Sequence, residues 1–363
     1  MPNVRRRTNV ACIGLGWVST NRHIPAIRRN PNLNLVGVVD RRPGRALKVA
    51  NELGISRHSE AASLDQIGWL DEVEAVAVGT PPGTHYELIS EALGLGKHVL
   101  TEKPFVMSVS EGELVLAAAR KAERTVTIVH NFQFADSFKA LERDLKSGRL
   151  GNIRSISGVQ MSNPSRRLPQ WYESLPFGLF YDESPHLLYL LRRLCGNNLE
   201  LNSASGYFRS PQNTPEVLSA ELAGRLEDGR QIPVGLYLNF VAPLSEWYVL
   251  VYGDDALGVV DLFRDVYLRL PNDGAHEAPA VLRTSLSASW QHWRQVITRG
   301  ISHLSGRLVY GNDIVFERFA RAVSEGVEQP SVSSQDALDV VRLQHAIIIM
   351  MKAAKVGTSD DYR

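Results

Sequence analysis

The first 130 residues alternate short apolar runs with segments whose apolar residues recur at helical spacing. Residues 10–13 and 33–39 are nearly unbroken apolar runs, as in strands that are buried on both faces. Between them, Ile24 and Ile27 share one helical face, with Pro25 in the first turn of that helix or kinking it. The same pattern predicts strands at 75–78, 98–100 and 126–129, and helices at 45–53, 85–95 and 112–122. This alternation predicts an α/β fold with a doubly wound parallel sheet.

The rest of the chain follows a different period. Helices are predicted at 137–146 and 185–194, and residues 201–270 mostly alternate apolar with polar positions, with Asp228 and Gly229 as a hairpin signal. Helical periodicity returns at 313–324 and 334–352. We therefore expect residues 1–130 to form a dinucleotide-binding Rossmann domain. Residues 131–363 would form an α+β substrate-binding and oligomerisation domain with a large, mainly antiparallel open sheet, its C-terminal helices able to pack back on the first domain.

Composition excludes several classes of protein. The chain has 363 residues and a formal net charge of +1, so no bulk attraction draws it to nucleic acid or to an anionic membrane. Its 2 cysteines are too few for a disulfide framework, and no histidine spacing indicates a metal site. Residues 1–8 do not lead into the apolar run of a signal peptide, and no stretch reaches the roughly 20 apolar residues of a membrane span. We expect a cytoplasmic protein.

A glycine-rich turn follows the first predicted strand and opens the first helix. Gly14 permits a tight turn there, and Gly16 permits close approach of the backbone to a pyrophosphate, with Trp17 and Val18 beginning the helix. The third fingerprint position holds Ser19 in place of glycine. An ordinary strand-to-helix turn is the alternative interpretation, but the position of the motif favours a dinucleotide site.

The end of the second predicted strand bears on the choice of cofactor. Asp40 lies 21 residues after Ser19, near the offset at which a carboxylate binds the adenosine ribose of NAD. Arg41 and Arg42 follow directly, where a guanidinium could hold the 2′-phosphate of NADP or could simply face water. We expect NAD, with NADP as the alternative.

Two further predicted strands end in polar turns. Thr80 and Pro81 follow one of them, and Glu102 and Lys103 follow the next. Ligands of an open parallel sheet bind beyond the carboxyl ends of its strands, so these turns should lie at one edge. Lys103 stands out because an ammonium group at that edge would face the cofactor, although a solvated lysine is the plainer interpretation.

These motifs together resemble the glucose-fructose oxidoreductase, inositol dehydrogenase and MocA (Gfo/Idh/MocA) family. The resemblance rests on the Gly14–Ser19 fingerprint, on Thr80-Pro81-Pro82 with His85 beyond it, and on the run from Gly96 to Glu102-Lys103-Pro104. Residues 177–186 resemble the signature of the family's second domain. The resemblance implies a Rossmann domain followed by an open-sheet domain, a catalytic trio of Lys103, Asp182 and His186, and a cis bond between Lys103 and Pro104. The cofactor residues that it and the motifs imply are Gly14, Gly16, Trp17, Val18, Asp40, Arg41, Thr80, Pro81, His85, Glu102 and Lys103.

Two positions depart from the family's pattern. The family places an acidic residue three positions after the histidine, where this chain has Tyr189. The glycine usual between the aspartate and the histidine is replaced by Ser184-Pro185, which stiffens the backbone.

The residues also support a mechanism directly. Pro185 is tolerated in a first helical turn, so we expect a helix that starts near Asp182 or Ser184 and carries Asp182 and His186 at one end. A mostly neutral His186 would take a hydroxyl proton as hydride leaves the same carbon, Lys103 would stabilise the developing alkoxide, and Asp182 would orient the substrate or His186. The alternative is that Asp182 and His186 form a cap pair on a core helix.

Weaker candidates for substrate contact, besides Lys103, Asp182 and His186, are Asn131, Trp171 and Tyr181, each of which could equally belong to the core or to a domain junction. Arg166 and Arg167 could hold a phosphate but more plainly face water.

We expect an NAD(P)-dependent oxidoreductase acting on a secondary alcohol or ketone of a sugar, cyclitol or nucleotide sugar. Two alternatives remain: a catalytically inactive, cofactor-sensing regulator, which Tyr189 would signal, and a reductase of a non-sugar carbonyl or a dihydrodiol. The resemblance also implies a homodimer or homotetramer formed through the open sheet, covering apolar surface around residues 236–240.

Overall fold

The computed structural model describes residues 6–209, 213–304 and 310–356. Residues 1–5, part of the segment on which the expectation of no signal peptide rests, lie outside these ranges. The chain divides into two compact units. The first comprises the residues up to Asn131 and Asn312–Arg342, and the second comprises Phe132–Gly311 and the residues from Leu343 onward. Among the described helices, none is long and apolar enough to cross a membrane.

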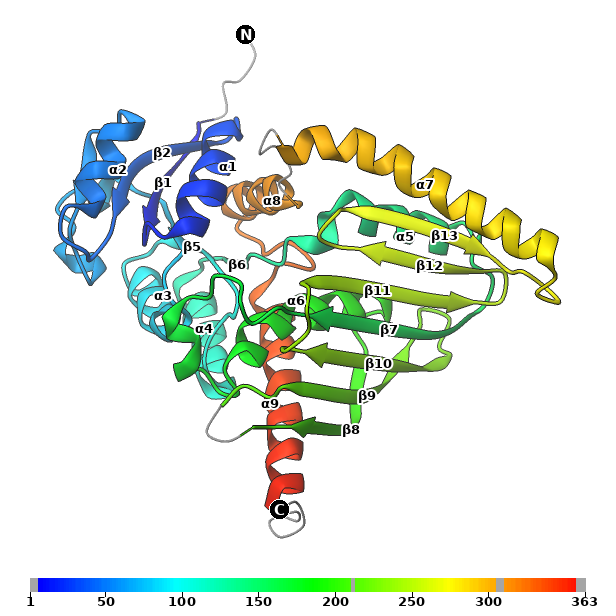
Figure 1. Ribbon diagram of the computed structural model, residues 1–363. Coiled ribbons are helices and arrows are strands. Elements are labelled where there is room, and N and C mark those ends of the chain that lie inside the picture. The colour runs from blue at the N-terminus through cyan, green and yellow to red at the C-terminus, as the bar shows by residue number, and fades with distance from the viewer. Residues whose placement is uncertain (1–5, 210–212, 305–309, 357–363) are drawn as a thin grey trace. The chain divides into compact units, whose positions relative to one another are not determined.

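The first unit is built on a parallel six-stranded sheet in the order β3-β2-β1-β4-β5-β6 (Figure 1). This order confirms the predicted doubly wound sheet, in which β2 and β3 are added on one side of β1 and β4 to β6 on the other, all parallel. The elements are β1 (Thr8–Ile13), η1 (Ser19–His23), α1 (Ile24–Arg29), β2 (Leu33–Val39), α2 (Arg45–Leu53), β3 (Arg57–Ser59), η2 (Leu64–Gln66), η3 (Leu70–Glu72), β4 (Ala75–Val78), η4 (Pro82–Thr84), α3 (His85–Gly94), β5 (His98–Thr101), α4 (Val109–Ala122), β6 (Val126–Ile128), α8 (Asn312–Glu325) and the first half of α9 (Ser334–Val356).

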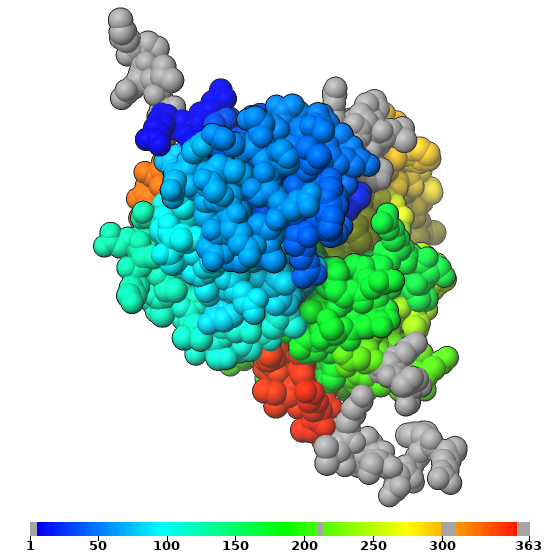
Figure 2. Space-filling view, turned by 90° about the vertical axis from the view of Figure 1, so that its left-hand side faces the viewer, coloured from blue at the N-terminus to red at the C-terminus, as the bar shows by residue number. Residues whose placement is uncertain are grey.

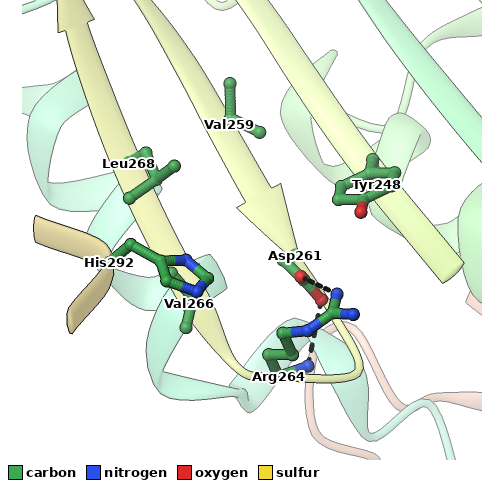
Figure 3. A pocket seen from close by; sticks show the side chains of 7 residues that line it. All are labelled: Tyr248, Val259, Asp261, Arg264, Val266, Leu268 and His292. Atoms are coloured by element: carbon green, nitrogen blue, oxygen red, sulfur yellow. Dashed lines mark hydrogen bonds and ion pairs between the residues drawn. The ribbon is translucent and has the colours of Figure 1, made fainter. Parts of the chain in front are cut away.

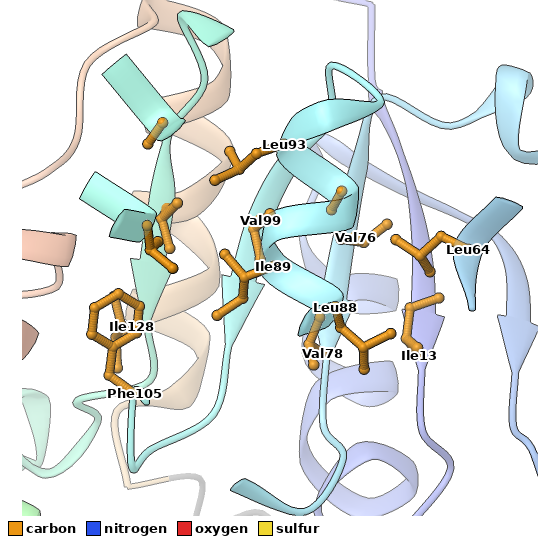
Figure 4. Packing of buried hydrophobic residues seen from close by; sticks show 14 of the residues in the cluster. Ile13, Leu64, Val76, Val78, Leu88, Ile89, Leu93, Val99, Phe105 and Ile128 are labelled. Atoms are coloured by element: carbon orange, nitrogen blue, oxygen red, sulfur yellow. The ribbon is translucent and has the colours of Figure 1, made fainter. Parts of the chain in front are cut away.

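Apolar side chains from the strands and from α3 and α4 form the core of this unit (Figure 4). The start of α9 joins that core through Ala337, Leu338 and Val341. Gly112 on α4 makes this possible, because a Cβ there would lie 2.6 Å from Cδ1 of Leu338. In Figure 2 the residues up to about 130, blue to cyan, form one continuous surface. Helix α8 and the start of α9 thus belong to the same unit as the Rossmann strands.

The second unit is built on a seven-stranded sheet in the order β13-β12-β11-β7-β10-β9-β8. Every neighbouring pair is antiparallel except β7 and β10, which confirms the mainly antiparallel sheet, and Gly229 at φ +85° turns the predicted hairpin. Its elements are η5 (Phe132–Phe134), α5 (Asp136–Lys146), β7 (Ile153–Met161), η6 (Gln170–Ser174), α6 (Leu179–Leu194), β8 (Leu199–Tyr207), β9 (Val217–Arg225), β10 (Gln231–Asn239), β11 (Glu246–Gly253), β12 (Ala256–Asp261), β13 (Val266–Pro271), α7 (Ala278–Leu304) and the end of α9.

One expectation about this unit was wrong, and one helix was not predicted. Leu236, Leu238 and Phe240 are buried, so the apolar residues of that strand face the core, and only Tyr237, 40% exposed, stands on the open face between them. Helix α7 was not predicted, although large apolar residues recur at helical spacing along it. In the structure these residues are exposed and the inner side of the helix makes polar contacts.

Candidate active site

The turn after β1 has the geometry that a phosphate-binding loop needs. Gly14 has φ +81°, and a Cβ there would lie 2.5 Å from Cγ2 of Thr80, so only glycine fits. Gly16 has open surroundings, with its nearest neighbour 3.9 Å from where a Cβ would be. The helical turns that follow begin at Trp17, which is exposed, so their unpaired N–H groups lie next to the glycine turn. This loop fits the pyrophosphate of a dinucleotide.

The departure at Ser19 is compensated across the sheet. Ser19 is fully buried at the third fingerprint position, where glycine normally lets the helix approach the strand. The residue opposite is Gly79, and a Cβ on Gly79 would lie 2.1 Å from Oγ of Ser19. The glycine that close packing requires is therefore at position 79 and not at position 19, and the helix can still approach the sheet closely.

Asp40 is fixed by the glycine turn itself. Its Oδ2 accepts the backbone N–H of Leu15 at 2.7 Å, and Arg42 donates to both of its carboxylate oxygens, at 2.8 and 2.7 Å. Burial works to raise the pKa of Asp40, but the hydrogen bonds from Arg42 and Leu15 outweigh it and lower the pKa. Asp40 therefore stays ionised, with both of its carboxylate oxygens hydrogen-bonded. Arg42 is the arginine that contacts it, whereas the predicted Arg41 is exposed.

His85 joins two of the loops at the strand ends. Its Nε2 lies 3.0 Å from the carbonyl oxygen of Thr80, and its Nδ1 lies 2.8 Å from that of Pro104. The ring is fully buried, and burial lowers its pKa despite the two carbonyls. His85 therefore holds the Thr80 loop against the loop of Lys103 and Pro104, whose peptide bond is cis.

Sequence reasoning missed a hydrogen-bonded pair beside Lys103. Nε2 of the fully buried His23 lies 2.7 Å from Oε1 of Glu102, and Oε2 of Glu102 accepts the backbone N–H of Lys103 at 3.2 Å. Burial works to raise the pKa of Glu102, but the contact with His23 and the charge of Lys103 lower it. A carboxylate thus stays ionised next to the Lys103 ammonium. No spacing in the sequence signals this pair, because His23 ends the helical segment η1 and Glu102 follows β5.

In the second unit, α6 carries Asp182 and His186 on one face. They are four residues apart and only 9% and 8% exposed. The helix begins at Leu179, earlier than predicted, because the hydroxyl of Thr214 accepts the Leu179 N–H at 3.0 Å. His186 therefore lies in the second turn, and the expected helix N-terminus at Asp182 or Ser184 was wrong.

Pro185 consequently stands inside the helix, between the two site residues. A proline there removes the hydrogen bond to the carbonyl four residues earlier, which is that of Tyr181. Gln344 on α9 replaces it, donating from Nε2 to the Tyr181 oxygen at 2.8 Å and to Oγ of Ser184 at 2.9 Å. Gln344 is fully buried, so α9 supplies the polar group that lets α6 continue through Pro185.

Tyr189 occupies the position of the family's acidic residue and contacts His186. Its hydroxyl oxygen lies 2.9 Å from Nδ1 of His186 and accepts the backbone N–H of Phe132 at 3.1 Å. The imidazole also packs edge-on against Phe132, with ring centroids 4.9 Å apart, and tilted against Trp247 at 5.2 Å. Three aromatic side chains therefore fix the plane of the His186 ring.

The other residues predicted to contact substrate differ in their exposure. Tyr181 is fully buried, with its hydroxyl 3.3 Å from Nε2 of His345, so we leave it out of the proposed substrate site. Asn131 is buried at the end of the first unit, and Trp171 is partly exposed in η6. Arg166 pairs with the buried carboxylate of Glu183, next to Asp182, and does not simply face water, whereas Arg167 does.

None of the predicted site residues lines the cavity of about 400 Å³ on the second sheet (Figure 3). Its wall is formed by Tyr248, Val259, Asp261, Arg264, Val266, Leu268 and His292. The charged side chains there neutralise one another, since Arg264 bonds Asp261 at 2.6 Å and also pairs with Glu246. This cavity has no chemistry in common with the strand-end loops or with α6.

Comparison with known proteins adds the family. Residues 8–130 match the model of the Gfo/Idh/MocA oxidoreductase family, described as having an NAD-binding Rossmann fold. The chain is 29% identical over 215 residues to scyllo-inositol 2-dehydrogenase (NAD(+)) of Bacillus subtilis, which covers 58% of this chain. It spans 60% of the length of that dehydrogenase.

Solved structures share the fold over nearly the whole chain. One is GenD2 from gentamicin A biosynthesis, in complex with NAD, at 19% identity and a TM-score of 0.73, covering 98% of this chain and 95% of GenD2. Another is KijD10, a 3-ketoreductase from Actinomadura kijaniata in complex with NADP and TDP-benzene, at 19% identity and a TM-score of 0.72, covering 95% of this chain and 98% of KijD10.

Proposed function

Because this chain belongs, through residues 8–130, to the Gfo/Idh/MocA family of NAD-binding oxidoreductases, we propose that it oxidises or reduces a secondary alcohol or ketone carbon of a sugar, cyclitol or nucleotide sugar. The observation that carries this proposal is the pair of Asp182 and His186 on one face of α6, with the His186 ring fixed by Tyr189. The inositol dehydrogenase relative and the 3-ketoreductase neighbour support the substrate class.

The residues divide the proposed mechanism between the two units. Bound NAD would exchange a hydride with the substrate carbon. His186 would exchange the hydroxyl proton, and Nε2 is the nitrogen that we assign to it because Nδ1 is engaged by Tyr189. Lys103 would stabilise negative charge on the substrate oxygen, and Asp182 would orient the hydroxyl or His186. Glu102, kept ionised, would hold the Lys103 loop in place.

For the cofactor we propose NAD, held by the Gly14–Gly16 turn, the helix that begins at Trp17 and Val18, and the Asp40 carboxylate. Thr80, Pro81, His85, Glu102 and Lys103 would complete the site from the neighbouring loops. NADP remains the alternative, because Arg42 lies beside Asp40 and could turn to a 2′-phosphate.

We also propose a homo-oligomer in the cytoplasm. The open face of the second sheet, on which Tyr237 stands, is the proposed contact between copies. Cys12 and Cys195 are buried, free thiols, and burial raises the pKa of each to about 12, so both are poor nucleophiles.

A substrate screen tests the proposal. Purified enzyme is mixed with sugars, inositols and nucleotide sugars, with NAD or NADP and with their reduced forms, and the nicotinamide absorbance at 340 nm is followed. Turnover of a polyhydroxylated compound is expected. Tight cofactor binding without turnover of any compound would instead identify a regulator. Turnover confined to non-sugar carbonyls or dihydrodiols would replace sugars by those compounds as the substrate class.

A further inference from the structure

Helix α7 carries its large apolar side chains on the outside. Leu282, Leu286, Trp290, Trp293 and Ile297 are 60–71% exposed. Their spacing of four, four, three and four residues places them along one face of the helix, and we name them the α7 stripe. None of residues 278–298, the part of α7 whose side chains the structure describes, is buried. Exposed apolar patches of this kind mark interaction sites.

The opposite side of α7 packs against the edge strand β13 of the second sheet, along which the helix runs (Figure 1). Gln295 accepts the backbone N–H of Tyr267 at 2.9 Å and donates to its carbonyl at 2.6 Å. Gln291 makes the same pair of bonds with Arg269, at 2.9 and 3.0 Å. Figure 3 shows His292 beside Leu268 of the same strand. The two glutamines replace a further strand on β13, so the helix is fixed and the stripe points away from the sheet.

The geometry points to a second copy of this chain as the occupant of the stripe. An antiparallel pair of helices related by a two-fold axis must place each residue opposite one at an equal distance on the other side of the axis. With the axis beside Trp290, midway between residues 289 and 290, Leu286 and Trp293 lie equally far from it on opposite sides, and so do Leu282 and Ile297. Trp290 would face its own copy, Leu286 would face Trp293, and Leu282 would face Ile297. The stripe is therefore complementary to itself.

The exposed area is large enough for a stable dimer. Covering two tryptophans, two leucines and an isoleucine at these exposures would remove roughly 700 Å² from water on each copy, or about 1,400 Å² in total, which is within the range of specific interfaces.

A lipid surface fits less well. Helices that lie on membranes carry several lysines or arginines on a polar face that is open to solvent. The polar side of α7 is instead bonded to β13 through Gln291 and Gln295. The helix has three arginines, Arg283, Arg294 and Arg299, but no lysine, and the net charge of the chain is +1. This interface is separate from the open sheet face proposed above, and it does not depend on the proposed activity.

The mass of the protein in solution tests the stripe. We expect light scattering after size-exclusion chromatography to give the Trp290→Glu/Trp293→Glu variant half the mass of the wild type. Leu114→Glu, which places the same charge at a 56% exposed leucine of α4, should leave the mass unchanged. Circular dichroism establishes that both variants are folded. An unchanged mass in a folded double variant would overturn the proposal.

Crosslinking tests the register, even where the charged variant fails to fold. Trp290→Cys should be joined to its own copy by a short bis-maleimide, because it would lie beside the two-fold axis, and the native Cys12 and Cys195 are buried. Leu282→Cys should not be crosslinked to its own copy, because the two cysteines would lie about 24 Å apart along the antiparallel helices. Equal crosslinking of both variants, or of neither, would contradict this pairing. Cosedimentation of the wild type, but not of Trp290→Glu/Trp293→Glu, with phosphatidylcholine and phosphatidylserine vesicles would assign the stripe to a lipid surface instead.

Discussion

The hydroxyl of Tyr189 lies 2.9 Å from Nδ1 of His186, one turn earlier on α6. A carboxylate in this position could only accept a hydrogen bond and would add a negative charge beside the imidazole. A phenol can accept or donate, and it is neutral. Because the same oxygen accepts the Phe132 N–H, Tyr189 is itself held in place. Tyr189, which departs from the family's pattern, therefore contacts and positions the His186 ring.

We predict that Tyr189→Phe lowers kcat about 10-fold with little change in KM, because it removes one hydrogen bond to the His186 ring and leaves the packing intact. Tyr189→Glu should restore part of kcat and move the acidic limb of the pH profile to higher pH, since a carboxylate favours the protonated imidazole. Steady-state kinetics from pH 5 to 9 measure both effects. A Tyr189→Phe enzyme with the wild-type kcat and pH profile would leave Tyr189 with a packing role only.

Asp40 should set the preference for the cofactor. Asp40→Ala is expected to weaken NAD binding by about 10-fold or more and to weaken NADP less, because the ribose acceptor is lost while Arg42 is released from its ion pair. Arg42→Ala should do the reverse. Dissociation constants from quenching of tryptophan fluorescence give the ratio for each variant. If the ratio of NAD to NADP affinity is the same in Asp40→Ala as in the wild type, Asp40 does not bind the ribose.

Gln344 should be needed for the stability of α6. Gln344→Met keeps the volume but leaves the buried Tyr181 carbonyl without the bond that Pro185 already denies it, so we expect a loss of about 1–3 kcal/mol in the free energy of unfolding. Gln335→Met, at an exposed position of the same helix, should cost less than about 0.5 kcal/mol. Urea denaturation compares the two. Equal losses would mean that the Tyr181 carbonyl does not depend on Gln344.

We expect His98 to make the protein less stable in mild acid. Burial, together with the charge of Arg124, lowers its pKa from 6.5 to about 4, and its Nδ1 accepts the Thr125 N–H at 3.1 Å. Because the unfolded chain binds the proton more readily, the contribution of His98 is complete above pH 6.5 and is lost as the pH falls towards 4. Between pH 7.5 and pH 5 the loss should be at most roughly 2 kcal/mol.

The comparison for His98 is between variants. His98→Gln should show a smaller decrease in unfolding free energy between these two pH values than the wild type. His58→Gln, which changes an exposed histidine of β3, should behave as the wild type does. A His98→Gln protein with the full wild-type decrease would assign the acid sensitivity to other groups.

Much of the first unit could be predicted from local pattern. The strands at Leu33–Val39 and Ala75–Val78 have the predicted bounds, because each is an apolar run closed by a polar residue or a glycine. The glycine turn could also be predicted from the sequence, since the positive φ of Gly14 is a requirement of the local backbone. The parallel order of the strands followed from the alternation with helices.

What the sequence did not reveal depends on residues that are distant in the chain. Helix α6 begins at Leu179 because Thr214 accepts its N–H, and it passes through Pro185 because Gln344 supplies a donor. Ser19 is accommodated because Gly79 lies opposite. Each of these pairings joins separate elements, and no periodicity in a single sequence encodes such a pairing.

The most direct test of the proposed function is the His186→Ala enzyme, assayed for turnover and for cofactor binding in the same preparation. The account predicts that kcat falls about 100-fold or more while the dissociation constant for NAD stays within about 2-fold of the wild type, because His186 is assigned to proton transfer and not to cofactor binding. Near-normal turnover on the substrate that the screen identifies would contradict the assignment of His186 as the proton-transferring group.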